Sequence, residues 1–406
     1  MKKRTILITI MVVISLVFIS GCTEEINDVN SIPGLFFDGN GGNDDLNSIA
    51  IDPDGYLFVV GGGWNLFDSI GTVGWIKKFD PSGNELWEKI FEESGEISSA
   101  TCDNNGNIYL VGTATLRGFW WIKKLDSNGD EDKINWNKSF YDGHAQSVVT
   151  DTDVNVYIAG YGSGMNPSTG NDWWIKKFDA NGNEDILNWN KTFDGNGSTD
   201  IVNSIATDTI GNVYVAGYGS NLIGSTFSDW WIKKFDTTGN ELWQKQYDGN
   251  GGPDSARCVV SDSHGNVYIA GDGTDIYNED SSWDYWVMKI NSSTGEREWE
   301  RIFDLNGSAD QANSIKTDIN GDIYIGGTGI NSDGSVWWII KLDSDGNQLW
   351  EKTFDVESGL AFLSSVATDL SGNLYSGGSG TDIKGSNTLV DWWIMKLNSD
   401  GNQLWQ

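Results

Sequence analysis

One motif recurs along the chain and restricts the folds that it can adopt. Its clearest copy, DWWIKKFDTTGNELWQK, runs from Asp229 to Lys245. Seven copies align on the second tryptophan of the pair or its equivalent, at Trp75, Trp121, Trp174, Trp231, Trp286, Trp338 and Trp393. Their spacing of 46 to 57 residues exceeds that of the common helical repeats and suits a unit of four strands. The sequence therefore predicts one repeat array in place of several independent domains.

Each repeat contains four short segments that have the composition of β-strands. In the fourth repeat these are NSIATD, VYVAG, DWWIKKFD and ELWQKQYD, which are bounded by Asp, Gly and Asn. Such segments are typical of strands. D-x-x-G-N turns join the first to the second strand and the third to the fourth, and the Gly takes the positive φ of a type I turn with a bulge. The third repeat departs from this pattern, with Val154-Asn155 in place of Gly-Asn.

Side-chain size increases from the first strand of the repeat to the last. The first strand carries a small residue, at Ser48, Ser99, Ser147, Ser204, Cys258, Ser314 and Ser365. The third carries the Trp pair, and we place a further Trp on the fourth, at Trp87, Trp136, Trp189, Trp243, Trp299, Trp350 and Trp405. Radial sheets crowd together at their axis and separate at the rim. This gradient therefore predicts an all-β, seven-bladed β-propeller of four-stranded antiparallel blades over residues 33–406.

The two ends of the repeat array complement each other. The last copy stops at Trp405-Gln406, before the KTFDGNG segment that continues the strand in other repeats, and residues 35–41 read LFFDGNG. We predict that this N-terminal segment supplies the outer strand of the last blade, because that pairing removes an exposed sheet edge.

The repeats resemble known propeller families. GNVYVAG at 211–217 and its relatives GNIYLVG, GNVYIAG and GDIYIGG resemble the SBBP-type family of seven-bladed propeller repeats, which is common in exported prokaryotic proteins. KFDTTGNELWQK is similar to the quinoprotein-type repeat with its blade-docking Trp. The resemblance covers residues 33–406 and implies the propeller fold. It implies no single activity, because these families include scaffolds, lyases and cofactor enzymes.

The N-terminus has the features of an export signal. Residues 1–4 are basic, residues 6–20 are mostly apolar, and Ile-Ser-Gly-Cys closes the segment. The apolar run is shorter than the about 20 residues of a membrane span, which favours a cleaved signal peptide over residues 1–21. The junction resembles the lipobox of prokaryotic lipoproteins and implies acylation of Cys22; an ordinary signal peptide or an uncleaved anchor are the alternatives. We expect an extracytoplasmic domain, attached to the membrane only by its lipid anchor through a polar tether at 22–32.

Charge and cysteine content limit the partners and the crosslinks. The formal net charge is −32, which argues against binding of nucleic acid or of anionic lipid and is compatible with divalent cations or basic partners. Cys102 and Cys258 fall in repeats that lie nearly opposite each other in a sevenfold ring. A disulfide needs Cα atoms within about 7 Å, so we expect two free thiols. We also expect a monomer.

Function is expected where the repeats differ, since features of every repeat are needed for packing. This rule assigns most tryptophans to the scaffold, together with the third-strand lysines Lys78, Lys124, Lys177, Lys234, Lys289, Lys341 and Lys396. The variable segments join the second and third strands, and they form one face with the segments that enter each first strand. Trp64 and Trp283 lie in these loops and are the candidate ligand-binding residues, for a sugar ring or a protein partner. The alternative is that each covers its own loop.

Four aspartates are the candidate metal ligands. Each stands eight residues before the Asp that opens the D-x-x-G-N turn between the first and second strands of its repeat. They are Asp44, Asp200, Asp254 and Asp310. Because they enter the innermost strand on the variable face, we expect them to ring the mouth of the axial channel. Carboxylates that converge there beside Gly-Asn-Gly segments suit Ca²⁺, the one candidate cofactor. The alternative is a solvated residue that fixes its own loop.

Catalytic motifs are absent from the sequence. His144 is expected on the variable face and His264 in a turn on the opposite face, and there is no G-x-S-x-G, H-E-x-x-H or C-x-x-C. We therefore predict an exported, membrane-anchored propeller that acts as a non-enzymatic binding or scaffold module for a protein or polysaccharide. The alternative is a glycan-active hydrolase or lyase that uses carboxylates at the channel mouth as acid and base.

Overall fold

The computed structural model describes residues 34–405, except for 40–41, 65, 67–70, 93–94, 115–117, 142, 164–169, 221, 223–226, 275, 277–281, 333, 357–358 and 382–389. The predicted signal peptide, Cys22 and the tether lie outside the described residues. Within the described part of the chain, no helix combines the length and the apolar character that are needed to cross a lipid bilayer.

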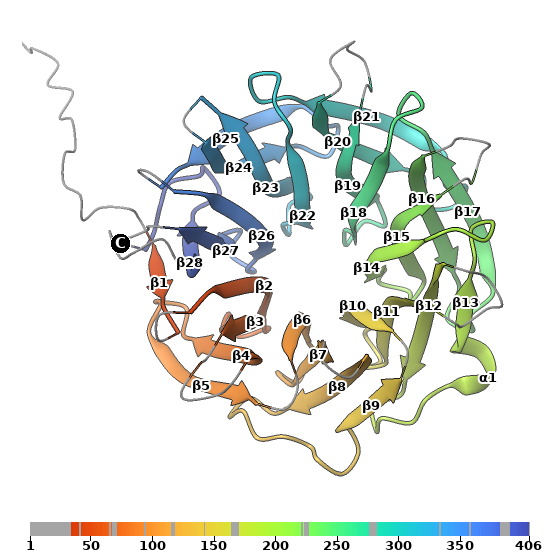
Figure 1. Cartoon of the computed structure of the whole chain (residues 1–406), viewed down its shortest axis with the longest axis vertical. Helices are drawn as coiled ribbons and strands as arrows, with labels where there is room; N and C mark the ends of the chain where they lie inside the picture. Colours follow the sequence, from red (N-terminus) through yellow and green to blue (C-terminus); the bar gives the residue numbers. More distant parts are fainter. Residues whose placement is uncertain are drawn as a thin grey trace, which may run out of the picture.

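Seven antiparallel sheets of four strands surround a central axis (Figure 1). The innermost strands are β2 (Asp44–Ile51), β6 (Glu96–Cys102), β10 (His144–Thr150), β14 (Ile201–Thr207), β18 (Asp254–Ser261), β22 (Gln311–Thr317) and β26 (Ala361–Thr368). We number the blades one to seven in the order of these innermost strands. The second strands are β3 (Leu57–Trp64), β7 (Ile108–Ala114), β11 (Val156–Ser163), β15 (Val213–Ser220), β19 (Val267–Thr274), β23 (Ile323–Asn331) and β27 (Leu374–Thr381). The predicted all-β, seven-bladed β-propeller is confirmed.

The third and outermost strands complete the blades. The third strands are β4 (Thr72–Phe79), β8 (Phe119–Leu125), β12 (Asn171–Phe178), β16 (Ser228–Phe235), β20 (Trp283–Ile290), β24 (Gly334–Leu342) and β28 (Val390–Leu397). The outermost strands are β5 (Glu85–Phe91), β9 (Lys138–Tyr141), β13 (Lys191–Phe193), β17 (Glu241–Tyr247), β21 (Arg297–Phe303), β25 (Gln348–Phe354) and, in blade seven, β1 (Leu35–Phe37).

The prediction of an outer-strand Trp in every blade is wrong for three blades. Trp136 lies in a turn, Trp189 ends the short helix α1 (Ile186–Trp189), and Trp405 follows a single isolated bridge. In blade three, the Asp185 side chain accepts a hydrogen bond from Asn188 N at 3.2 Å, so the segment after the turn begins as a capped helical turn. The indoles are nevertheless buried, because the outer gap between blades needs their volume and tolerates different backbones.

The D-x-x-G-N turns adopt the predicted geometry. In blade four, Asp208 Oδ1 accepts hydrogen bonds from the backbone N of Ile210 and Asn212 at 3.2 and 2.8 Å, and Gly211 has a φ of +85°. In blade three, Val154 takes the place of this Gly and is held at a φ of +63°. A β-branched residue is strained in this region, so the fold imposes the turn even where the local sequence opposes it.

The Trp pairs join neighbouring blades. The first aromatic residue of a pair packs on the second Trp of the next blade, with ring centroids 4.1 to 4.6 Å apart, in Trp120–Trp174, Trp173–Trp231, Trp230–Trp286, Tyr285–Trp338, Trp337–Trp393 and Trp392–Trp75. Blade one has Gly74 at the first position. Its interface with blade two uses Phe91 instead, whose ring lies 6.1 Å from that of Trp121.

The two ends of the chain share blade seven, as predicted. Strand β1 pairs antiparallel with β28, with Phe36 opposite Trp393. Blade seven in turn contacts blade one, because Lys396 Nζ donates a hydrogen bond to Pro81 O at 2.9 Å and Ile49 N donates to Ser365 Oγ at 3.2 Å. The ring is therefore closed by side chains and by strand pairing.

The two described cysteines are free thiols, as predicted. Burial raises the pKa of Cys258 to about 12 and also raises the pKa of Cys102. A thiol reacts as its thiolate, so in a Cys22→Ser protein we expect slow reaction with Ellman's reagent at pH 8 and release of two equivalents after denaturation. Rapid stoichiometric labelling of the native protein would contradict this expectation.

Candidate functional site

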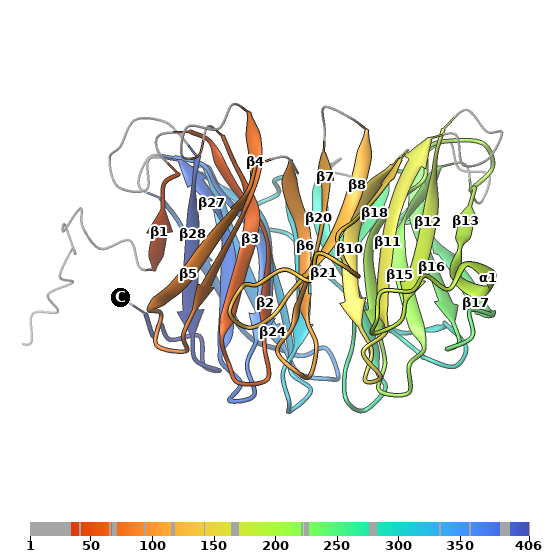
Figure 2. The same ribbon diagram turned by 90° about the horizontal axis from the view of Figure 1, so that it is seen from below.

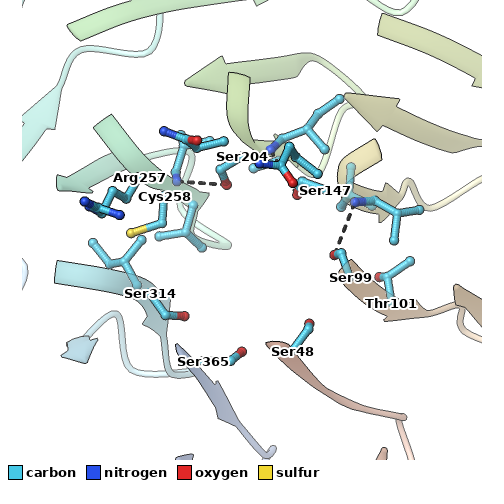
Figure 3. A pocket seen from close by; sticks show the side chains of 18 of the residues that line it. Ser48, Ser99, Thr101, Ser147, Ser204, Arg257, Cys258, Ser314 and Ser365 are labelled. Atoms are coloured by element: carbon cyan, nitrogen blue, oxygen red, sulfur yellow. Dashed lines mark hydrogen bonds between the residues drawn. The ribbon is translucent and has the colours of Figure 1, made fainter. Parts of the chain in front are cut away.

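A polar cavity of about 350 Å³ lies on the propeller axis (Figure 3). The small residues of the innermost strands line it, as their size suggested. Six serines also accept a hydrogen bond from a backbone N–H of a neighbouring blade, at 3.1 to 3.4 Å, and these are Ser48, Ser99, Ser147, Ser204, Ser314 and Ser365. The serines thus serve the innermost strands in two ways: they are small enough for the crowded axis, and their hydroxyl groups form hydrogen bonds between blades.

Two basic residues depart from the repeat pattern inside this cavity. Asn47, Asn203 and Asn313 share one inner-strand position, and each donates to a carbonyl of the next blade at 2.8 to 3.0 Å. Blade five has Arg257 at that position, and blade six carries Lys316 two residues beyond its Ser. Both line the cavity. Function is expected where the repeats differ, so Arg257 and Lys316 make their side of the axial cavity a candidate functional region.

A second cavity, of about 620 Å³, forms a groove above blades three to five. It lies on the loop face, which we define as the face opposite the first-turn hairpins seen along the lower edge of the ring in Figure 2. Its aromatic and basic lining consists of Tyr161, Tyr218, Phe227, Trp283 and Arg257. The remaining lining is Gln146, Thr199, Ile201, Asn203, Ser220, Ser228, Pro253 and Ser255. The groove thus combines flat apolar rings with hydrogen-bonding groups.

Two tyrosines at equivalent positions form one wall of the groove. Tyr161 and Tyr218 lie near the ends of β11 and β15, where other blades have Gly, Thr, Asp or Ser. The ring of Tyr161 stacks on His144 with centroids 5.1 Å apart, and Trp173 Nε1 donates to Tyr218 O at 3.2 Å. Burial raises the pKa of both tyrosines, so both hydroxyls stay protonated at neutral pH and can donate as well as accept.

Arg257 lines both the groove and the axial cavity, and a buried carboxylate holds its side chain in place. Its Nε donates to Asp272 Oδ1, and Asp272 is fully buried while the Arg257 side chain is 31 % exposed. Burial raises the pKa of Asp272 and the neighbouring guanidinium opposes that rise. A buried carboxylate thus orients the guanidinium and leaves part of it open to a ligand.

The structure separates the two tryptophans that the sequence singled out. Trp283 is half-buried at the start of β20 and lines the groove. Trp64 ends β3 in blade one, is 50 % exposed and is not part of the groove. The sequence interpretation missed Tyr161, Tyr218 and Arg257. A comparison of the repeats position by position would have found them, because each replaces a smaller or uncharged residue.

The four candidate metal ligands lie below the surface. Asp44, Asp200, Asp254 and Asp310 are 0 % exposed and line neither the axial cavity nor the groove. They do not meet in one ring, since each belongs to a separate cluster with two further aspartates. The histidines are also apart, as expected: His144 begins β10 beside the groove, and His264 lies in the β18–β19 turn on the opposite face.

Comparison with known proteins identifies relatives in fold. No protein-family model matches this chain, and no curated protein matches it either. The chain is similar to a PL25 ulvan lyase bound to -[GlcA(1-4)Rha3S]-, with a TM-score of 0.53 and 11 % identity over 90 % of this chain and 97 % of that chain. It is also similar to a quinohemoprotein alcohol dehydrogenase from Comamonas testosteroni (TM-score 0.51, 11 % identity, 92 % and 77 % covered) and to Sqt1 from Chaetomium thermophilum (0.50, 12 %, 93 % and 87 %). At such identities the likeness shows the β-propeller fold alone.

Proposed function

We propose that this protein is an exported, membrane-anchored propeller that binds a polysaccharide in the groove of its loop face. The observation that carries the proposal is the combination of Tyr161, Tyr218, Phe227 and Trp283 with the fixed guanidinium of Arg257 in one cavity. Sugar rings present C–H faces that pack on aromatic rings, and their hydroxyls need hydrogen-bonding partners. The volume of about 620 Å³ falls in the range that bound small molecules occupy.

The charge of the groove narrows the class of polysaccharide. The described residues of its lining include one cation and no Asp or Glu, so their local field does not repel a neutral or sparsely charged chain. The net charge of −32 opposes a densely sulfated or fully uronic polymer, because long-range repulsion slows the approach of like-charged partners. A neutral glycan, or one with an occasional uronate that pairs with Arg257, fits both features.

The groove supports binding better than hydrolysis. Glycoside hydrolysis ordinarily requires two carboxyl groups about 5 to 10 Å apart across the scissile bond, and the described residues that line the groove include no Asp or Glu. A lyase is the second candidate. In that reaction Arg257 would neutralise the uronate carboxylate, a base such as His144, which stacks on Tyr161, would take the proton from C5, and the protonated Tyr218 would give a proton to the leaving oxygen as the C–O bond breaks. Appearance of an unsaturated uronate, detected by ultraviolet absorbance, would favour that candidate.

Export and acylation at Cys22 belong to the same proposal. They rest on the basic residues 1–4, the apolar residues 6–20 and the lipobox-like junction. We expect the mature protein to begin at an acylated Cys22, which mass spectrometry of the membrane-extracted protein would detect. A mature chain that starts elsewhere, or a Cys22 without acyl groups, would contradict the anchor without affecting the groove.

Substitution of the groove residues tests the binding proposal. In a Cys22→Ser protein screened on a glycan array, we expect Trp283→Ala and Arg257→Gln each to weaken binding of the selected glycan about tenfold, which corresponds to about 1.4 kcal/mol. The loss of a stacking surface or of a charged hydrogen bond is of this size. Titration calorimetry measures the affinities, and the melting temperatures of the variants check that they fold.

Trp64→Ala is the matched control, because Trp64 is an exposed loop-face tryptophan outside the groove. We expect its affinity to equal that of the unsubstituted protein. Weakening by Trp64→Ala with no effect of Trp283→Ala would move the site to blade one. If no glycan binds, and if a pull-down captures a protein that the Arg257→Gln variant no longer captures, the ligand of the groove is a protein and not a polysaccharide.

A further inference from the structure

In the part of the chain that the structure describes, four clusters of aspartates, which we name the acid triads, lie between neighbouring blades. In each acid triad, one carboxylate oxygen from every residue lies within 4.8 Å of the other two. The acid triads are Asp38–Asp44–Asp391, Asp172–Asp194–Asp200, Asp229–Asp248–Asp254 and Asp284–Asp304–Asp310. Each candidate ligand named from the sequence is thus one of three carboxylates that converge at a site of its own.

The members of an acid triad come from three strands of two adjacent blades. Between blades four and five, Asp229 lies in β16, Asp248 directly follows β17 and Asp254 begins β18. The other acid triads use the equivalent positions, with β1 as the outer strand for Asp38. A ligand held by all three carboxylates would therefore connect one blade to the next at the loop face.

Backbone groups hold the carboxylates in place. Asp229 and Asp254 are 0 % exposed, whereas Asp248 is exposed and opens the acid triad to solvent. Gly251 N donates to Asp248 Oδ1 at 2.5 Å, and Gly249 N donates to Asp254 Oδ2 at 2.6 Å. These donors fix the geometry but carry no net charge, so they do not neutralise the cluster. The solvent-facing member provides a route of entry for an ion.

Asp44 gives an independent sign of a ligand. Its side chain is 0 % exposed, and Gly39 N donates to its Oδ2 at 2.5 Å. Among the residues that the structure describes, its buried Oδ1 accepts no hydrogen bond of normal geometry. A buried carboxylate oxygen without a partner is costly. Asp44 belongs to the cluster with Asp38 and Asp391, where a cation held between the three carboxylates would neutralise it.

The three remaining blade interfaces provide an internal comparison. There the third-strand position and the inner-strand position are both apolar or small, in the pairs Val73 with Gly95, Phe119 with Gly143, and Val336 with Ala361. The two aspartates are thus present together in four interfaces and missing together in three. An aspartate that only fixed its own loop would not depend on the residue across the interface. Joint presence indicates a ligand that needs both carboxylates.

We propose that each acid triad binds one Ca²⁺ ion, so that four structural cations connect blades seven to one and three to six. Carboxylate oxygens are the ligands of hard divalent cations, and Ca²⁺ accepts six to eight oxygens in adaptable geometry, whereas Mg²⁺ demands a near-ideal octahedron. Three carboxylates held this close repel one another, and a bound cation removes that repulsion.

Calcium binding to the purified Cys22→Ser protein tests the proposal. After removal of metals with a chelator, equilibrium dialysis against Ca²⁺ followed by elemental analysis is expected to give four ions per chain, one per acid triad. The melting temperature is expected to rise on addition of Ca²⁺ and to rise much less with the same concentration of Mg²⁺. No bound Ca²⁺ and an unchanged melting temperature would overturn the proposal and leave protons as the neutralising species.

Single substitutions assign the ions to the acid triads. Asp229→Asn removes one buried carboxylate with almost no change of volume and is expected to lower the stoichiometry to three. If that variant does not fold, Asp248→Asn at the exposed edge of the same acid triad replaces it. Asp355→Asn is the matched control, because Asp355 follows β25 as Asp248 follows β17, at an interface with Val336 and Ala361 in place of the other aspartates. Four ions in Asp229→Asn and Asp248→Asn, or three in Asp355→Asn, would contradict the assignment.

Discussion

Replacement of Trp120 by alanine is expected to lower the free energy of unfolding by about 3 to 5 kcal/mol, the range for large-to-small changes at buried Trp and Phe positions. Trp120 is 1 % exposed, and its ring stacks on Phe140 at 4.2 Å and on Trp174 of the next blade at 4.4 Å. The variant therefore loses apolar burial and both ring contacts, and it leaves a cavity between blades two and three. Chemical denaturation followed by tryptophan fluorescence measures the change.

Trp64→Ala separates this effect from the general loss of an indole. Trp64 is 50 % exposed, and surface substitutions usually change stability by no more than about 0.5 kcal/mol. Equal destabilisation by Trp64→Ala and Trp120→Ala would mean that the Trp pairs do not join the blades in the way described here.

Removal of β1 is expected to produce a loss of similar size. A chain that begins at residue 38 lacks Leu35, Phe36 and Phe37, which are half-buried in the interfaces of blade seven with blades one and six. At about 1.5 to 3 kcal/mol for a fully buried side chain, the three half-buried side chains together contribute about 2 to 4.5 kcal/mol. The truncation also leaves the edge of β28 without its partner, and exposed edges pair with other molecules. We expect a lower melting temperature and aggregation on heating.

The comparison is made with a chain that begins at residue 34, so that the two proteins differ only in the segment that contains β1. A synthetic peptide of residues 34–38, added to the shorter chain, is expected to recover part of the lost stability. Indistinguishable melting temperatures of the two chains would show that strand pairing between the termini does not close the ring.

The fold was predictable because every structural feature occurs several times. The turn at Asp208 and the small inner residue Ser204 have counterparts in the other repeats, so a local exception such as Val154 did not obscure the pattern. The outer strands of blades two and three were not predictable. Trp136 and Trp189 occupy the expected sequence position, but a packed indole requires only its volume in the gap and does not determine whether a strand or a helical turn presents it.

The candidate sites were only partly predictable, since they combine residues from different repeats. Asp254 was identified from its position, but its neighbours Asp229 and Asp248 stand on two other strands, and the direction of their side chains follows from the sheet register. Arg257 was overlooked because it occupies a position where Asn is structural in other blades. Sequence periodicity identifies what the blades share, and the proposed sites lie at positions where the blades differ.

The interface between blades one and two lacks two features found at other interfaces, the stacked Trp pair and the acid triad. Gly74 stands where a ring would pack on Trp121, and a Cβ there would meet Gly95 O and Ile97 Cγ1 at 3.0 Å. Val73 and Gly95 occupy the positions of the acid triad aspartates. We therefore expect this joint to rely on the hydrogen bonds that Ser48 and Asn47 make with blade two and on the packing of Phe91 against Trp121.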